Sequence, residues 1–194
     1  MRTIYLSCSF LLIILSTDIS SSFAHSSSYR PIKSFVFDKD KIEKNLRLQL
    51  NEYLLAINQG DADAALKYIY PDVFVYVKRQ YPEDYDLERI KGQMRESMSK
   101  MKATVRAQKL TYVIHMGEIT NRVTTGKYTI YTIVVRITSK KGLDVISFGE
   151  EVIAITEDNG IDWRFISSSD ITGPILRLKF SKETVSRILI KNQH

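Results

Sequence analysis

Histidine and cysteine, the residue types that most often carry catalysis or bind metals, are scarce in this chain. It has three histidines and one cysteine in 194 residues. His194 ends the chain and His25 precedes the first helical pattern, so His115 is alone within the domain. A Ser-His-Asp triad also needs a serine motif, and no Gly-x-Ser-x-Gly sequence occurs here. Zinc sites are commonly built on two or three histidines, and no histidine pair exists, so we predict no metal and no cofactor.

Two adjacent glutamates, Glu150 and Glu151, lie in the apolar strand pattern VISFGEEVIAIT. Because neighbouring residues of a strand point to opposite faces, Glu151 shares a face with Ile153, and Glu150 shares the other face with Val152. One of the two should therefore face a cavity. Burial there would raise its pKa, as a general acid requires, and would equally suit an ion pair with an arginine such as Arg164.

Aromatic residues form a further group of candidates. Tyr53, Tyr68, Tyr76, Tyr112 and Trp163 either line a cavity for a flat apolar ligand or are core and rim residues of a sheet, since aromatics favour strands. A ligand in such a cavity would be mostly apolar with one hydrogen-bonding end. The candidate ligand-binding residues are Tyr53, Tyr76, Tyr112, His115, Glu151 and Trp163.

Helical periodicity dominates the first half of the sequence. Residues 39–59 place apolar side chains three and four apart, which predicts a long amphipathic helix. Gly60 is suited to end that helix and Asp61 to cap a short second helix, residues 61–70, which Pro71 should stop.

A strand pattern follows, then a third helix and a run of strands. Residues 73–77 alternate as a strand would, and residues 87–102 carry apolar residues at helical spacing after a capping Asp86. Further strands are predicted at residues 105–116, 127–137, 143–156 and 161–167, with hairpin turns at 140–142 and 157–160. Helices followed by an antiparallel meander predict an α+β fold.

The stretch LNEYLLAINQGDADAALKYIYPDVFVYV, residues 50–77, resembles the opening of the nuclear-transport-factor-two-like superfamily, which includes ketosteroid isomerases and SnoaL-like cyclases. The stretch EDNGIDWRFIS, residues 157–167, looks like that family's final hairpin. The resemblance implies a cone-shaped domain over residues 38–170, with the N-terminal helices packed on a curved antiparallel sheet. It also implies a homodimer through the outer face of the sheet.

The same resemblance tests the isomerase chemistry residue by residue. The family's tyrosine falls on Tyr53 and its acid close to Glu151, but its base falls on Val77, which cannot carry a proton. We therefore expect a non-enzymatic ligand-binding or protein-interaction domain. The alternative is a small-molecule isomerase- or cyclase-like enzyme that uses Tyr53 and Glu151.

The two ends of the chain predict export and an added helix. Residues 1–24 have the charged start, apolar run and small-residue end of a signal peptide cleaved after Ala24, which implies a secreted or periplasmic protein with no membrane span after cleavage. Cys8 would leave with that peptide, so the mature chain would have no thiol. A polar segment, residues 25–37, leads into the domain. Residues 171–194 form a C-terminal extension with the breaker pair Gly173-Pro174 and a last helix capped by Ser181, expected to pack on its own sheet.

The formal net charge is +6, and much of the excess lies between Arg89 and Lys109. This basic region has no interleaved aromatic residues, so it lacks the pattern of a nucleic-acid reader, and we predict no nucleic-acid partner. An exported basic protein would meet anionic glycans or lipid headgroups first.

Overall fold

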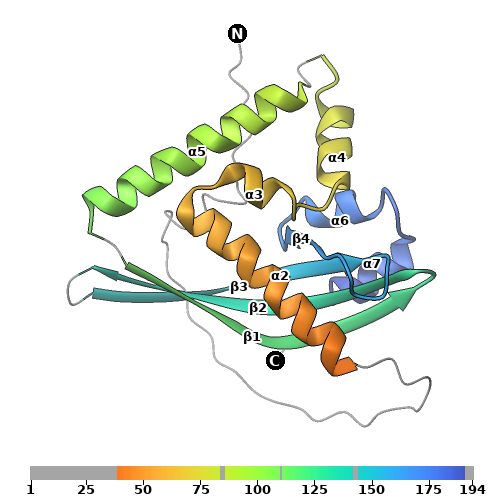
Figure 1. The fold of residues 1–194 in the computed structure, drawn as a ribbon. Coiled ribbons are helices and arrows are strands. Elements are labelled where there is room, and N and C mark those ends of the chain that lie inside the picture. The colour runs from red at the N-terminus through yellow and green to blue at the C-terminus, as the bar shows by residue number, and fades with distance from the viewer. Residues whose placement is uncertain (1–38, 84–85, 110, 142–143, 191–194) are drawn as a thin grey trace.

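The computed structural model describes residues 39–83, 86–109, 111–141 and 144–190. It is an α+β fold in which helices pack on an open, four-stranded antiparallel sheet of order β1-β2-β3-β4 (Figure 1). The helices are α2 (Lys39–Gln59), α3 (Ala62–Leu66), α4 (Asp72–Gln80), α5 (Leu87–Ala107), α6 (Thr172–Leu176) and α7 (Lys182–Ile188). The strands are β1 (Thr111–Thr125), β2 (Tyr128–Lys141), β3 (Asp144–Thr156) and β4 (Arg164–Ser167). The predicted signal peptide and the segment 25–37 lie outside the described residues.

The joint between α2 and α3 forms as the sequence predicts. Gly60 has a φ of +73°, a backbone conformation that glycine adopts without strain. The side chain of Asp61 caps α3 by accepting a hydrogen bond from the backbone N–H of Ala64 at 3.0 Å. The second helix is shorter than predicted and ends at Leu66.

The predicted strand at residues 73–77 is wrong, because this segment belongs to helix α4. Pro71 has helical φ and ψ at the N-terminus of α4, where its missing N–H costs no hydrogen bond. Asp72 in the first turn and the basic residues of the last turn suit the helix dipole. Val73 and Tyr76 lie three residues apart and both pack into the core, as helical spacing requires.

The boundaries of α5 and β1 also differ from the prediction. Helix α5, capped by Asp86, continues to Ala107, so Val105 is helical rather than the start of a strand. Strand β1 continues to Thr125, beyond its predicted end at 116, and turns into β2 at Gly126, whose φ is +54°. Its register against β2 shifts between Met116 and Asn121.

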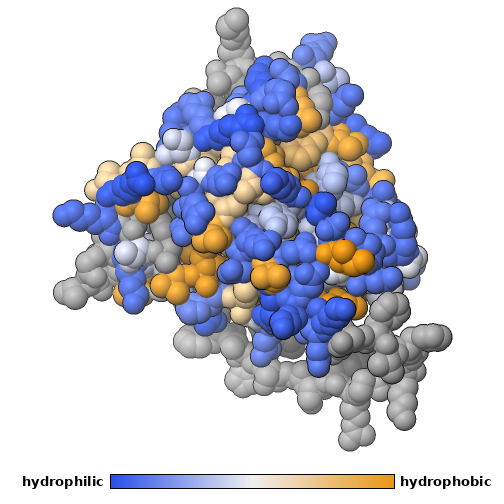
Figure 2. Space-filling model, viewed as in Figure 1, coloured by the Kyte–Doolittle hydropathy of each residue, from blue (hydrophilic) through white to orange (hydrophobic). Residues whose placement is uncertain are grey.

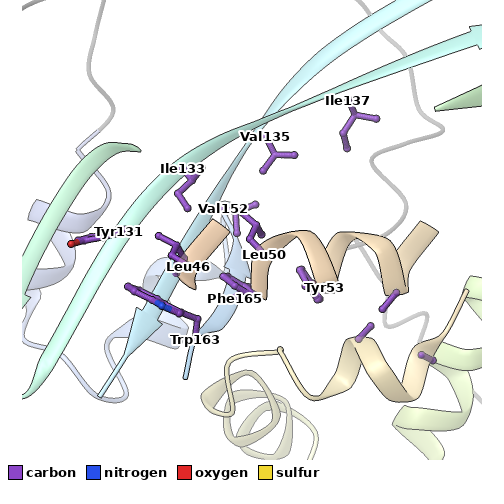
Figure 3. Packing of buried hydrophobic residues seen from close by; sticks show 14 of the residues in the cluster. Leu46, Leu50, Tyr53, Tyr131, Ile133, Val135, Ile137, Val152, Trp163 and Phe165 are labelled. Atoms are coloured by element: carbon purple, nitrogen blue, oxygen red, sulfur yellow. The ribbon is translucent and has the colours of Figure 1, made fainter. Parts of the chain in front are cut away.

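The sheet has a hydrophobic core on each face. Helix α2 packs its buried face against one face of the sheet: Figure 3 shows Leu46, Leu50 and Tyr53 of α2 beneath Ile133, Val135 and Ile137 of β2. On the opposite face, α6 and α7 pack against residues that include Ile130, Ile153 and Ile155. The C-terminal extension therefore covers its own sheet, as expected.

Local contacts explain three further features of the fold. Ser181 caps α7 by accepting from the N–H of Thr184 at 3.2 Å. The predicted breaker pair, Gly173-Pro174, lies within a helix. Pro174 is in the first turn of α6, where a backbone N–H would have no acceptor within the helix, so its absence costs no hydrogen bond. At the β4 edge, the N–H of Tyr70 donates to the Phe165 carbonyl at 3.0 Å, which ties the segment after α3 to the sheet.

Candidate functional site

A cavity lies between the C-terminal halves of α2 and α5 and the sheet. Its volume is about 210 Å³. In Figure 2, hydrophobic residues are visible in the region where Figure 1 places the sheet near the C-terminal end of α5. The lining is mostly apolar and comprises Tyr53, Leu54, Ile57, Asn58, Met101, Lys102, Val105, Arg106, Ile114, Val135, Ile137, Glu150, Val152 and Ser167. The size and the apolar lining suit a small organic molecule.

The strand register determines which glutamate reaches this cavity. Glu150 is paired with Val135 and Glu151 with Val134, so the two carboxylates project from opposite faces of β3. Val135 and Glu150 both line the cavity. Glu151 is half-buried on the face that α6 and α7 cover further along the sheet. The pocket glutamate is therefore Glu150, and the candidate Glu151 is not among the lining residues.

Glu150 is a half-buried acid with one fully buried oxygen atom. Its Oε1 atom is buried and has no hydrogen-bond partner among the described residues. Burial raises the pKa of the Glu150 carboxyl, and a hydrogen bond with Ser167 opposes that rise without cancelling it. A protonated carboxyl donates a hydrogen bond and an ionised one accepts, so Glu150 can serve either kind of ligand group. A buried polar atom without a partner is costly, and a ligand could supply the partner.

Tyr53 is held rigidly beside this acid. Its ring stacks on Phe165 with centroids 5.4 Å apart and an angle of 26° between the planes. It also meets Tyr68 edge-on at 6.2 Å. Burial raises the pKa of the Tyr53 phenol, and the negative charge of Glu150 raises it further, so the phenol stays protonated at neutral pH. Tyr53 can therefore donate a hydrogen bond.

Two basic residues of α5 lie at the more exposed end of the cavity. Lys102 donates from Nζ to the Gln59 carbonyl at 2.8 Å, so it also caps the C-terminal end of α2. Arg106 is exposed in the last turn of α5, and Asn58 is exposed across from it on α2. The cavity thus combines an acid and a phenol with cations near its opening.

Most of the other candidates lie elsewhere. His115 is exposed and projects from the opposite face of β1 to Ile114, which lines the cavity. Tyr76 is on α4 and packs into the core beneath α6 and α7. Trp163 is fully buried and packs 5.4 Å from Tyr131. The side chain of Tyr112 lies outside the described part of the chain.

Arg164, considered as an ion-pair partner of a glutamate, and Tyr68, considered as a cavity residue, have other contacts. Arg164 donates to the Trp163 carbonyl at 3.0 Å, and no ion pair between Arg164 and Glu150 or Glu151 is found in the described residues. Tyr68 bonds through its hydroxyl to the Glu52 carboxylate at the surface of the helical layer. Neither Arg164 nor Tyr68 lines the cavity.

Several lining residues escaped the sequence analysis. Met101 and Val105 are four residues apart on α5 and would share a helical face, but Val105 was assigned to a strand. Ser167, at the end of β4, has no signal in the sequence that sets it apart from Ser168 and Ser169. Its role follows from the position of β4 beside β3 in the sheet.

The chemistry open to this site is narrow. Glu150 is the single carboxylate among the described residues of the lining, so the cavity has no second carboxylate there. Within the part of the chain that the structure describes, no three His, Cys, Asp or Glu side chains are grouped to hold a metal ion. Helices long and apolar enough to cross a bilayer are likewise absent from the described segments. No protein-family model matches the chain, and no curated protein matches it.

Proposed function

We propose that this chain is a non-enzymatic binding domain for a small, mostly apolar molecule with one hydrogen-bonding end. The observation that carries the proposal is the buried Oε1 atom of Glu150, which has no hydrogen-bond partner in the described part of the chain and belongs to a residue that lines an apolar cavity. A bound carbonyl or phenol could meet this carboxyl and the Tyr53 phenol together. The apolar walls would cover the remainder of the ligand.

Binding is favoured over catalysis because the described lining of the cavity supplies one carboxylate and no second carboxylate to act with it. The residue that falls on the isomerase base, Val77, is buried on α4 and does not line the cavity. With no second carboxylate among the described lining residues, an enzyme that moved a proton between two carbon atoms would have to use Glu150 as both acid and base.

The raised pKa of Glu150 supports an isomerase- or cyclase-like enzyme as the second candidate, because a general acid works best with a pKa near the operating pH. In that case Glu150 takes the role expected of Glu151, and Tyr53 stabilises a developing oxyanion. Turnover of an enolisable ketone that is lost in Glu150→Gln, with binding retained, would favour this candidate over simple binding.

We also propose that the domain is a divergent member of the nuclear-transport-factor-two-like superfamily and that the sheet forms the wall of a cone. The support is the α2-Gly60-Asp61-α3 joint followed by the antiparallel meander. Helix α4 departs from that pattern, since the resemblance places a strand there. We further propose export with cleavage after Ala24, which intact-mass measurement of secreted protein would test by the presence or absence of residues 1–24.

A homodimer through the sheet remains part of the proposal. The outer face is covered by α6 and α7 at one end, while Val113 is 43% and Val145 58% exposed at the other end. Light scattering on purified protein tests this contact. A dimer that Val113→Asp converts to a monomer would support it, and a monomer at high concentration would end it.

The binding proposal is tested by a thermal-shift screen of naphthols and cyclic ketones, because a ligand that binds only the folded state raises its stability. A matched pair of variants shows where a compound binds. Val105→Trp should fill the cavity, whereas Val75→Trp adds the same ring on the exposed side of α4. We expect a compound that shifts the wild type and Val75→Trp but not Val105→Trp. If anionic oligosaccharides shift the midpoint and no apolar compound does, the basic region from Arg89 to Lys109 becomes the binding surface instead.

A further inference from the structure

The positive charge of α5 is unevenly compensated. Lys91 pairs with Glu88 at 2.7 Å, Arg95 with Asp63 at 2.5 Å and Lys100 with Glu96 at 2.6 Å. The pattern ends at the C-terminal turn of the helix, where Arg106 makes no ion pair with any described residue and borders the cavity. Arg106 is thus a cation at the opening of the cavity that has no ion-pair partner among the described residues.

The other polar groups of the opening do not neutralise Arg106. Lys102 has the same sign of charge and already donates to the Gln59 carbonyl, and Asn58 is neutral. The one carboxylate among the described lining residues, Glu150, comes from β3 and is half-buried. An anion at the opening would therefore gain the attraction of Arg106 and Lys102 while its charge stays in contact with solvent.

We propose that the ligand carries an anionic group at the end opposite its hydrogen-bonding end, and that Arg106 binds this group at the opening of the cavity. The ligand class is then an apolar organic acid, a carboxylate or sulfonate, whose apolar body enters the cavity between α2 and α5. This inference rests on the proposed function, because it assigns a second polar contact to the same cavity.

The test uses two fluorescent probes that share one ring system and differ in charge. Anilinonaphthalene sulfonate is anionic, and phenylnaphthylamine is its neutral counterpart. Both become bright in apolar sites, so their affinities for the full mature chain can be measured by titration. Specific binding is the part of the signal that Val105→Trp removes and Val75→Trp leaves unchanged.

Arg106→Gln removes the charge at the opening. Lys109→Gln is the matched control, because Lys109 is exposed just beyond the end of α5 and does not line the cavity. In Arg106→Gln we expect the affinity for the sulfonate to fall about fivefold, near the upper end for an exposed ion pair, while the affinity for the neutral probe stays within about twofold. Lys109→Gln should change neither affinity. Added salt should weaken binding of the sulfonate and leave binding of the neutral probe unchanged.

The possible outcomes separate this inference from the proposed function. If both probes bind the cavity and Arg106→Gln weakens the sulfonate no more than Lys109→Gln does, the anionic end is refuted and the binding domain stands. If Val105→Trp removes the binding of neither probe, both this inference and the proposed function are refuted. Selective loss of sulfonate binding in Arg106→Gln supports the inference.

Discussion

Tyr53 of α2 and Glu150 of β3 line one cavity, where burial raises the pKa of the phenol and the charge of the carboxylate raises it further. The two residues are far apart in the sequence and come from different layers of the fold. Their electrostatic interaction means that ionising Glu150 makes ionisation of Tyr53 harder, so the phenol remains a hydrogen-bond donor. This pair defines the polar end of an otherwise apolar cavity.

Replacing Glu150 by Gln should change how stability depends on pH. The folded-state pKa of Glu150 lies above its unfolded value, so the stabilisation is fully present below the unfolded pKa and is lost as pH rises through the folded pKa. Between those two values the wild type should lose unfolding free energy that Glu150→Gln does not lose. Urea denaturation of both proteins at a series of pH values measures this. Parallel profiles would contradict the burial of this carboxyl.

Replacing Tyr53 by Phe should weaken binding of a carbonyl compound that passes the thermal-shift screen. The ring and its stacking on Phe165 remain, and one donor is lost, so we expect a loss of about 1 kcal/mol in binding free energy. Calorimetric titration gives the value. Tyr76→Phe, which changes a tyrosine of the other core, is the control and should bind as the wild type does.

The two leucines of α2 should respond differently to truncation. Leu50 is fully buried between α2 and the sheet, and Leu48 is 57% exposed on the same helix. Leu50→Ala should lower the free energy of unfolding by about 2–5 kcal/mol, because it removes buried methyl groups and leaves a cavity. Leu48→Ala should change it by less than about 0.5 kcal/mol. Equal losses in chemical denaturation would mean that α2 does not pack as the structure shows.

Two glycines have a positive φ, and replacing each by alanine measures the cost of backbone strain with and without a steric clash. A Cβ at Gly160 would lie 2.9 Å from Ile42 of α2, whereas a Cβ at Gly126 would have no neighbour within 4 Å. We expect Gly126→Ala to cost about 1 kcal/mol of stability from strain alone, and Gly160→Ala about 2–4 kcal/mol. Adding Ile42→Ala should make the penalty of Gly160→Ala smaller than it is in the wild type. No such reduction would show that the turn does not pack on α2.

The sequence predicted the elements that have local signals. Asp61, Asp86 and Ser181 cap helices in the structure because a capping side chain needs only its own neighbours. The segment at 73–77 failed for a physical reason, since a run of consecutive apolar residues fits a strand and a buried helix equally well. The pair Pro71-Asp72 before this run is typical of the first turn of a helix, and it favours a helix over a strand for the segment.

The site was less predictable than the fold. Both faces of β3 are apolar because helices cover both faces of the sheet, so twofold periodicity could not separate Glu150 from Glu151. That choice depends on where α2 and α5 lie, which is tertiary information. Tyr53 was identified through the family resemblance, and the structure places it in the cavity. His115, Tyr76 and Trp163 were candidates by residue type alone, and the structure places them elsewhere.

The most direct test of the central claim is the carbon-13 chemical shift of the Glu150 carboxyl, assigned by its absence in Glu150→Gln. We predict that this signal titrates at a higher pH than those of the exposed glutamates, because burial raises its pKa. We also predict that it moves when a compound from the thermal-shift screen is added and does not move in Val105→Trp. A Glu150 signal that titrates with the exposed glutamates and is unaffected by a bound compound would contradict the proposal that this carboxyl forms the polar end of a ligand site.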